Sequence, residues 1–317
     1  DGVGTTDSVE PLSRAQGPSP PQALTPARIR SAENPTSRTA WVTILLLAVN
    51  IGVWLFVQQG QSGIEAAEFS LEYAAIPCEV VEGRPLTTDE INITYSARGD
   101  DEACGLGGPD SPAPFPDKRI YLAVLFSMFL HGSWLHIGGN MLFLWIFGNN
   151  IEDRMGPVRY LLFYAIGGLA AFAAHVVPQT ASTVPVIGAS GAVAAVMGAY
   201  LVWYPNAPVR TLFIVLLIWI RDVRAKWLLA GWFVLQFFTG QDSGIAWLAH
   251  VGGFVFGAVI ALAARAMSGM ARVMFDADHR PSGRWDSTGG IGRGPYDRGR
   301  RTLSDDPGDR RFGGRRY

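Results

Sequence analysis

The run Gly188-Ala189-Ser190-Gly191 lies near the start of an apolar segment, residues 186–204, that contains no charged residue. A second apolar segment carries His250, and a third carries His136 and Asn140. Hydroxyl, imidazole and amide groups are costly inside a lipid bilayer, so their presence in such segments indicates a function. A serine nucleophile, a histidine base and two hydrogen-bond donors for an oxyanion would account for all four side chains.

The composition is that of a membrane protein with polar ends. Of the 317 residues, 49% are hydrophobic and only 17% are charged, which is too apolar for an ordinary soluble chain. Residues 1–38 are rich in Pro, Ser and Thr, and residues 268–317 are rich in Gly and Arg, so we expect two disordered tails. Arg-Gly runs can bind nucleic acid, but a tail solvated near an anionic membrane surface fits better, and no nucleic-acid partner is expected.

Six apolar segments between the tails predict membrane-spanning helices. They are residues 41–58, 124–149, 159–177, 186–204, 226–239 and 245–267. The first is expected to be a retained span rather than a removed signal peptide. The prediction is an all-α membrane protein with a six-helix domain over residues 39–267, which includes an outer loop at 59–118.

The charges of the loops predict the orientation. Residues 60–117 contain twelve Asp or Glu against two Arg, whereas residues 150–159 carry Arg154 and Arg159, and residues 205–226 carry three Arg and one Lys. By the positive-inside rule, both tails lie in the cytoplasm and the acidic loop lies outside a cell (plasma) membrane. The apolar stretch 211–220 is too short to span, so we expect an interfacial or re-entrant piece on the cytoplasmic side.

This topology brings the polar side chains to one depth. The fourth and sixth spans run in the same direction, and Ser190 and His250 each lie about five residues, or roughly 8 Å, inside them. His136 and Asn140 share one face of the second span, for which Ser133 is the expected N-cap. A seventh span would move His250 to the opposite side of the membrane.

Small residues predict that the fourth and sixth spans pack closely, because helices in membranes approach each other through such residues. They recur every four positions, at Ser190, Ala194 and Gly198 in one span and at Ala249, Gly253 and Gly257 in the other. The hydroxyl of Ser190 would then reach a ring nitrogen of His250. Each of these residues alone is more often a packing or hydrogen-bonding group, and it is their combination that favours catalysis.

Over residues 41–267 the chain resembles the rhomboid family of intramembrane serine proteases. The motifs that carry the resemblance are His131-x4-His136-x3-Asn140, Glu152-Asp153-Arg154-Met155-Gly156, Gly188-Ala189-Ser190-Gly191, and Ala249-His250 followed by Gly253 and Gly257. The resemblance implies a compact six-helix bundle with a water-filled cavity open to the outside. It also implies that the substrates are transmembrane segments of other membrane proteins, cleaved near their outer ends.

The resemblance also implies a role for each matched residue. Ser190 corresponds to the nucleophile and His250 to its general base, without a third acidic residue. His136, Asn140 and the backbone N–H of Ser190 correspond to the oxyanion donors. Structural positions are matched by Gly188, Gly191, His131, Glu152, Gly253 and Gly257, and a lateral substrate gate by Trp232 and Phe233. Ala194 departs from some members, in which an aromatic ring at this position packs against the catalytic histidine. No cofactor or metal is expected.

The only two cysteines, Cys78 and Cys104, lie in the acidic loop. Because that loop is expected outside, where disulfides persist, we expect the two residues to form one.

Two alternatives have different chemistry. A zinc protease could use His131, His136 and His250 as ligands, but residues 131–136 lack the glutamate of a His-Glu-x-x-His helix. A catalytically silent rhomboid-like membrane binding protein, or a transporter, would not need both Ser190 and His250. A serine-directed probe separates the protease from the silent forms.

Overall fold

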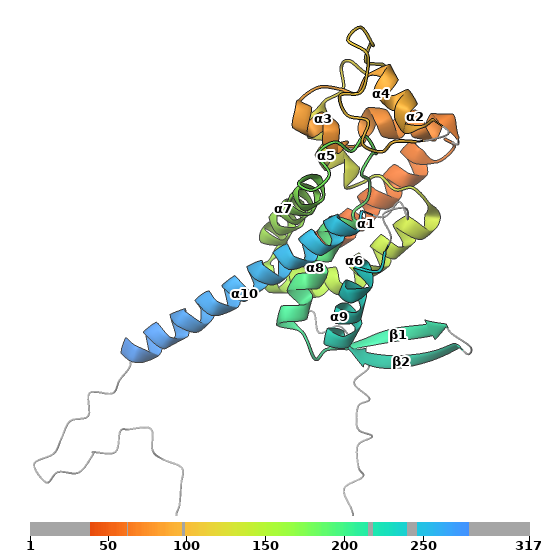
Figure 1. Cartoon of the computed structure of the whole chain (residues 1–317). Helices are drawn as coiled ribbons and strands as arrows, with labels where there is room; N and C mark the ends of the chain where they lie inside the picture. Colours follow the sequence, from red (N-terminus) through yellow and green to blue (C-terminus); the bar gives the residue numbers. More distant parts are fainter. Residues whose placement is uncertain (1–38, 62, 97–98, 215–217, 240–245, 279–317) are drawn as a thin grey trace, which may run out of the picture. The chain divides into compact units, whose positions relative to one another are not determined.

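The computed structural model describes residues 39–278 except residues 62, 97–98, 215–217 and 240–245 (Figure 1). The predicted N-terminal tail, residues 1–38, and residues 279–317 of the predicted C-terminal tail lie outside the described residues. The chain divides into two compact units, Asp1–Leu262 and Ala263–Tyr317, and the contacts that form the core and the site described below lie within the first.

The described residues are mainly helical. The elements are α1 (Trp41–Val53), a π-helical turn η1 (Trp54–Gln58), α2 (Ile64–Tyr73), α3 (Pro77–Glu82), α4 (Thr88–Thr94), α5 (Ile120–Ser127), α6 (Trp134–Met155), α7 (Pro157–Val176), α8 (Ser190–Trp203), β1 (Pro208–Ile214), β2 (Ile218–Arg224), α9 (Ala225–Gln236) and α10 (Trp247–Asp278).

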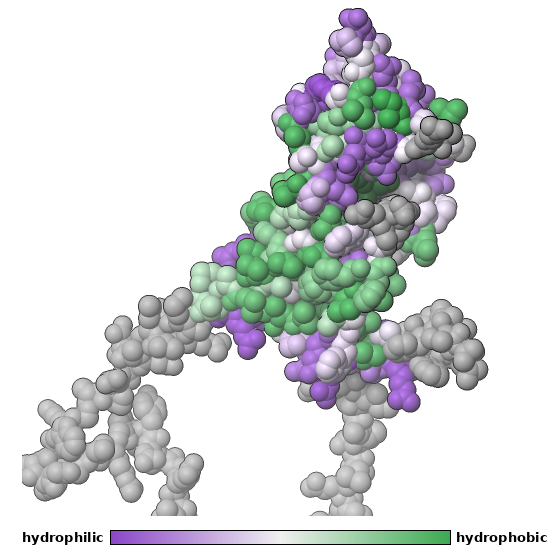
Figure 2. All heavy atoms as spheres, viewed as in Figure 1, coloured by the Kyte–Doolittle hydropathy of each residue, from purple (hydrophilic) through white to green (hydrophobic). Residues whose placement is uncertain are grey.

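α8 forms the core of the bundle. Every residue from Gly191 to Tyr200 is buried, as expected for a helix that is apolar on all sides. It packs against both α6 and α7, and the ring of Tyr200 lies edge-on to Phe147 of α6 with 4.9 Å between centroids. In Figure 2, hydrophobic residues gather over these helices, whereas hydrophilic residues gather over α2–α4.

α8 and α10 approach each other backbone to backbone. A Cβ atom added at Gly253 would overlap the carbonyl oxygen of Gly191, and one added at Gly257 would overlap that of Ala195. Only glycine fits at such positions. On α8 these two contacts fall one residue after the expected Ser190 and Ala194 positions. The third expected position, Gly198, does meet α10, since a Cβ atom added there would overlap the carbonyl oxygen of Phe254.

Glu152, near the end of α6, caps the beginning of α1. Its carboxylate accepts hydrogen bonds from the backbone N–H groups of Val42 (2.9 Å) and Thr43 (2.7 Å) and from the Thr43 hydroxyl (2.8 Å). These N–H groups have no partner within their own helix, and a carboxylate also complements the positive helix end. Glu152 thereby holds α1 against α6.

His131 lies in the turn before α6 and is tied to the end of η1. Gln58 Nε2 donates to the His131 carbonyl at 2.9 Å, and the His131 N–H donates to Gln58 Oε1 at 3.0 Å. The buried His131 ring lies edge-on to that of His136, with 5.1 Å between centroids. His131 thus supports the position of His136.

The expected count of six spanning helices is not confirmed. In the described chain, three helical stretches are long and apolar enough to cross a membrane: Trp41–Gln58, Pro157–Val176 and Trp247–Ser268. α8 and α9 have only 14 and 12 residues. α6 is longer, but its last two turns carry Asn, Glu, Asp and Arg side chains.

Two predicted boundaries are wrong. The segment 124–149 is not one continuous helix, because α5 ends at Ser127 and α6 begins at Trp134. Toward the C-terminus, α10 continues to Asp278, so the expected tail does not begin at residue 268.

The predicted N-cap of α6 is confirmed, since the Ser133 hydroxyl oxygen accepts a hydrogen bond from the His136 N–H at 3.1 Å.

The stretch 211–220 belongs to a β-hairpin, which the all-α prediction missed. β1 and β2 pair antiparallel, with Pro208 opposite Arg224 and Arg210 opposite Asp222 (Figure 1). Many residues here are β-branched or aromatic, types that favour strands over helices. The base of the hairpin is closed by backbone hydrogen bonds from Ala225 N–H to the Ala207 carbonyl and from Lys226 N–H to the Pro205 carbonyl, both 2.9 Å.

The loop expected at 59–118 contains a folded unit, which we call the α2–α4 subdomain (residues 64–118). Its small core is formed by Leu71, Ile76, Cys78 and Leu86. Lys118, at its end, forms a buried ion pair with Glu79 (2.5 Å) and donates to the Leu71 carbonyl (2.6 Å). The subdomain rests on the segment before α8 through hydrogen bonds from Cys78 N–H to the Ser182 carbonyl and from Val186 N–H to the Ala75 carbonyl.

Candidate active site

Ser190 and His250 meet where their helices begin. Ser190 is the first residue of α8, and His250 lies in the first turn of α10. The distance from Ser190 Oγ to His250 Nε2 is 2.8 Å, which is hydrogen-bond distance. Both side chains are half-buried, and the close approach of the two helix backbones, described above, makes the contact possible.

His136 lies beside this pair. A Cβ atom added at Gly188 would be 2.7 Å from His136 Nε2 and 3.5 Å from Ser190 Oγ, so the imidazole and the hydroxyl flank the same glycine. Gly188 has a φ of +124°, a conformation that other residues rarely adopt. Glycine is required here both for its backbone conformation and for space.

His136 and Asn140 both have an N–H group available to a ligand. The Gly132 N–H donates to His136 Nδ1 at 3.3 Å, so in the neutral ring the hydrogen is on Nε2, the nitrogen nearest Ser190. Asn140 is buried, and its Nδ2 has no hydrogen-bond partner among the residues that the structure describes. A buried donor without a partner is rare, and both side chains line the cavity described next.

These side chains line one cavity of about 750 Å³. Its walls come from α6, α7, α8, α9, α10 and the α2–α4 subdomain. The polar and aromatic residues that line it include Asp101, Glu102, His136, Asn140, His175, Ser190, Trp232 and His250. The cavity is large enough for several residues of a peptide together with water.

α9 supplies an aromatic contact to His250. Trp232, which the resemblance assigned to a gate, packs its ring against His250 with 5.8 Å between centroids. Phe233 instead packs on Phe254 of α10, at 4.8 Å. Ala194, where some relatives have an aromatic ring, is fully buried, so the ring beside His250 comes from a different helix.

Gln236 is a residue of the site that the sequence did not predict. Its Oε1 lies 2.7 Å from His250 Nδ1, on the opposite side of the imidazole from Ser190. From the sequence, only an Asp or Glu side chain would be expected to pair with His250. The available signal was a polar Gln within a predicted span, one turn after Trp232. Its contact with His250 could not be read from the sequence, because the two residues lie in different predicted helices.

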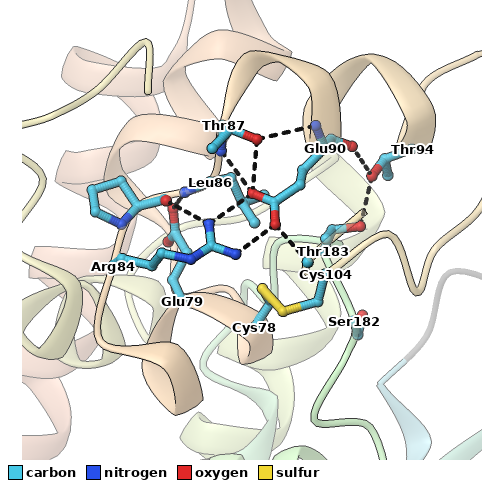
Figure 3. Close-up of a disulfide and its surroundings, with 12 residues drawn as sticks. Cys78, Glu79, Arg84, Leu86, Thr87, Glu90, Thr94, Cys104, Ser182 and Thr183 are labelled. Carbon is cyan, nitrogen blue, oxygen red and sulfur yellow. Dashed lines mark hydrogen bonds and ion pairs between the residues drawn. A yellow bond between two sulfur atoms is a disulfide. The ribbon is translucent and has the colours of Figure 1, made fainter. Parts of the chain in front are cut away.

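Cys78 and Cys104 are joined by a disulfide in the structure (Figure 3). Next to it, Arg84 binds both carboxylate oxygens of Glu90, at 2.6 and 2.8 Å, and the Gly105 N–H donates to Glu90 Oε1 at 2.7 Å. The Arg84 guanidinium lowers the pKa of Glu90 to about 2. Thr183 N–H donates to the Asp101 carbonyl, which ties this region to the cavity rim.

The histidines proposed as zinc ligands in the alternative reading do not converge. In the described part of the chain, the side chains that lie close enough together to hold a metal ion are Cys78, Glu90 and Cys104. The two cysteines of this group are bonded to each other in a disulfide. His131, His136 and His250 form no such group there.

Comparisons with known proteins agree on one family. Residues 118–266 match the Rhomboid domain. The chain is 28% identical over 150 residues to presenilin-associated rhomboid-like protein, mitochondrial, of Bos taurus, covering 44% of this chain and 37% of that protein. It is 28% identical over 150 residues to rhomboid protease AarA of Providencia stuartii, covering 43% of this chain and 53% of that protein. It is 29% identical over 92 residues to rhomboid protein 1, mitochondrial, of Saccharomyces cerevisiae, covering 28% of this chain and 27% of that protein.

The matched region thus covers 37%, 53% and 27% of the length of these three relatives. Two of the three are named as mitochondrial. The expectation of a plasma-membrane location is therefore not supported, whereas a membrane protein is, because both the domain match and the apolar helices indicate one.

Proposed function

We propose that this chain, which belongs to the rhomboid family through its domain at residues 118–266, is an intramembrane serine endopeptidase. Its substrates would be transmembrane segments of other membrane proteins, and Ser190 and His250 would be its catalytic residues. The observation that carries the proposal is the 2.8 Å contact between Ser190 Oγ and His250 Nε2 at the wall of a cavity with two further donors.

In the first step His250 Nε2 takes the proton of Ser190 while Oγ attacks the scissile carbonyl carbon. The carbonyl oxygen becomes an oxyanion, and we propose that His136 Nε2–H, Asn140 Nδ2–H and the Ser190 backbone N–H bind it. Ser190 begins α8, so its N–H has no partner within the helix, and the positive end of the helix favours the negative charge.

The second half of the reaction returns the enzyme to its starting state. His250 passes its proton to the leaving amine, which leaves Ser190 as an acyl ester. A water in the cavity then gives a proton to His250 Nε2 and attacks the ester, so that the new carboxyl end is released and Ser190 regains its hydrogen. Apart from the substrate and this water, every group in these steps belongs to the chain, so we propose no cofactor or metal.

We propose that the bundle crosses the membrane six times, with α6, α8 and α9 tilted or extended by neighbouring residues. Ser190 and His250 both lie at the beginnings of their helices, so α8 and α10 run in the same direction away from the site. The cavity and the α2–α4 subdomain would then lie on the acidic, outer side, and the hairpin on the basic, inner side.

The deciding experiment is labelling with a fluorophosphonate probe, which reacts with an activated serine. The purified full chain should be labelled at Ser190, and Ser190→Ala and His250→Ala should each abolish both labelling and cleavage of a transmembrane substrate. Ser268→Ala, which removes a hydroxyl bonded to its own helix, serves as the matched control and should retain both. An unlabelled wild type would instead support a catalytically silent binding protein.

A further inference from the structure

Gln236, the last residue of α9, holds the ring of His250 from the side opposite Ser190. Gln236 Oε1 lies 2.7 Å from His250 Nδ1, while His250 Nε2 lies 2.8 Å from Ser190 Oγ. Gln236 is buried, with only 7% of the residue's surface exposed. The imidazole therefore bridges a buried amide and the hydroxyl of the proposed nucleophile.

A second hydrogen bond determines which way the amide points. Gln236 Nε2 donates to the backbone carbonyl of Trp232, one turn earlier, at 3.0 Å. A carbonyl oxygen can only accept, so the amide nitrogen must face Trp232 and the amide oxygen must face His250.

The tautomer of His250 follows from this orientation. An amide oxygen has no hydrogen to donate, so His250 Nδ1 must carry the hydrogen of the bond with Gln236. A neutral imidazole has one ring hydrogen, and Nε2 is therefore left with the lone pair that faces Ser190. This is the form that can take a proton from the serine hydroxyl.

We propose that Gln236 is a positioning residue that holds His250 in the Nδ1-protonated tautomer. This inference deepens the proposed function and rests on it. In many serine hydrolases a carboxylate has this role. A neutral amide orients the ring in the same way without placing a negative charge in an apolar bundle, where an unpaired charge is costly.

The proton balance of the reaction leaves Gln236 unchanged. As Oγ attacks, the Ser190 proton moves to His250 Nε2, and the Nδ1 hydrogen stays in its bond to the amide oxygen. The resulting imidazolium has one hydrogen on each nitrogen, and the Nε2 hydrogen later goes to the leaving amine. Because Trp232 also packs on the ring, α9 supplies both the acceptor and the aromatic contact for the base.

The first test compares variants of Gln236 in the full chain. Gln236→Met keeps the length but removes the acceptor, and we expect kcat to fall by about 10- to 100-fold while KM changes less than about twofold. Gln236→Glu retains an acceptor oxygen and should recover most of the loss. Gln236→Ala is a second variant without an acceptor, and Leu235→Met at the exposed neighbouring position should keep wild-type kinetics. Equal kcat for wild type, Gln236→Met and Gln236→Ala would overturn the proposal.

The second test reads the tautomer without any turnover. Ring ¹⁵N chemical shifts of His250 are measured in Ser190→Ala and in the double variant Ser190→Ala/Gln236→Met. We expect an Nδ1-protonated ring in the first and a mixture of tautomers in the second. Identical shifts would overturn the role of Gln236 even if Ser190 is the nucleophile. By contrast, a wild type that fluorophosphonate does not label would overturn the proposed function and leave the tautomer result standing.

Discussion

Gly188 and His136 are so close that no side chain fits between them. A Cβ atom at Gly188 would lie 2.7 Å from His136 Nε2, the nitrogen that we assign as an oxyanion donor. Gly188 also has a φ of +124°, and its N–H donates to the Ser127 carbonyl at 2.8 Å. The backbone before the nucleophile is thus fixed by α5, and the donor is positioned against it.

We therefore expect Gly188→Ala to impair catalysis. The added methyl group must move His136 Nε2 away from the oxyanion site, and the strained φ displaces the backbone before Ser190. Turnover should fall by roughly 10²–10³-fold, as for loss of one oxyanion donor. Gly138→Ala on α6, where an added Cβ meets nothing within 4 Å, is the matched control. Cleavage of a transmembrane substrate measures both, and near-normal turnover of Gly188→Ala would contradict the assignment of His136.

The two side-chain donors should each contribute less than the nucleophile. We expect His136→Ala and Asn140→Ala each to lower kcat by roughly 10²–10³-fold, because each removes one donor aimed into the cavity. Water in the vacated space can replace part of the lost hydrogen bond, so the double variant should lose less than the product of the two single effects. Initial rates with a transmembrane substrate provide the measurement. Unchanged rates in both single variants would remove these residues from the oxyanion site.

Much of the candidate site could be anticipated from short motifs. Polar side chains in apolar segments are costly in a membrane and indicate a function, which singles out Ser190, His250, His136 and Asn140. The structure brings all four to one cavity. The contact of Gln236 with His250 could not be predicted in this way. It depends on where α9 ends relative to α10, which is a property of tertiary packing.

The fold was less predictable where it depends on distant partners. The helices of the α2–α4 subdomain are short and are held by contacts such as Lys118 with Glu79, which no local pattern indicates. The hairpin at 208–224 was missed because a short apolar run does not distinguish a strand from a helix by periodicity. By contrast, the Ser133 N-cap is set by residues three apart, and it was predicted correctly.

We propose that the Cys78–Cys104 disulfide forms in the native protein and stabilises the α2–α4 subdomain. The two residues are 26 positions apart, and closing a loop of this length is worth about 3 kcal/mol in the chain-entropy account. Replacing both cysteines by Ser should lower the unfolding temperature and, because Asp101 of this region lines the cavity, reduce cleavage. Maleimide labelling in denaturant should require prior reduction, and equal labelling without it would argue against the bond.

Glu90 should make the α2–α4 subdomain sensitive to acid. Arg84 lowers the pKa of Glu90 to about 2, below the value of about 4.3 for an unfolded chain. Its contribution to stability is therefore present above pH 4.3 and is lost as the pH falls toward 2. Protection of the α4 amides against hydrogen exchange, corrected for intrinsic rates, should be lower in Glu90→Gln than in wild type at pH 6. The difference should shrink toward pH 2, and a constant difference would contradict this role.

The hairpin predicts the topology on which the catalytic proposal depends. Because β1 and β2 pair antiparallel and Pro208 faces Arg224, the chain returns to the place from which it left α8. Hydrogen bonds of Ala225 and Lys226 with residues 207 and 205 close this base. A segment that returns to its own start makes no net crossing, so the end of α8 and the beginning of α9 should lie on the same side of the membrane.

This topology can be tested with single cysteines in a background without Cys78 and Cys104. The exposed positions Val158, Arg210 and Arg224 should react with an impermeant thiol reagent only after the membrane is permeabilised. Tyr95, exposed on the α2–α4 subdomain, should react from outside in intact membranes. Protection at Arg210 combined with outside labelling at Arg224 would mean that the chain crosses between them. α9 would then begin outside, and α10 would run opposite to α8. Ser190 and His250 could then not meet at the beginnings of their helices, so both the proposed topology and the proposed catalytic pair would be wrong.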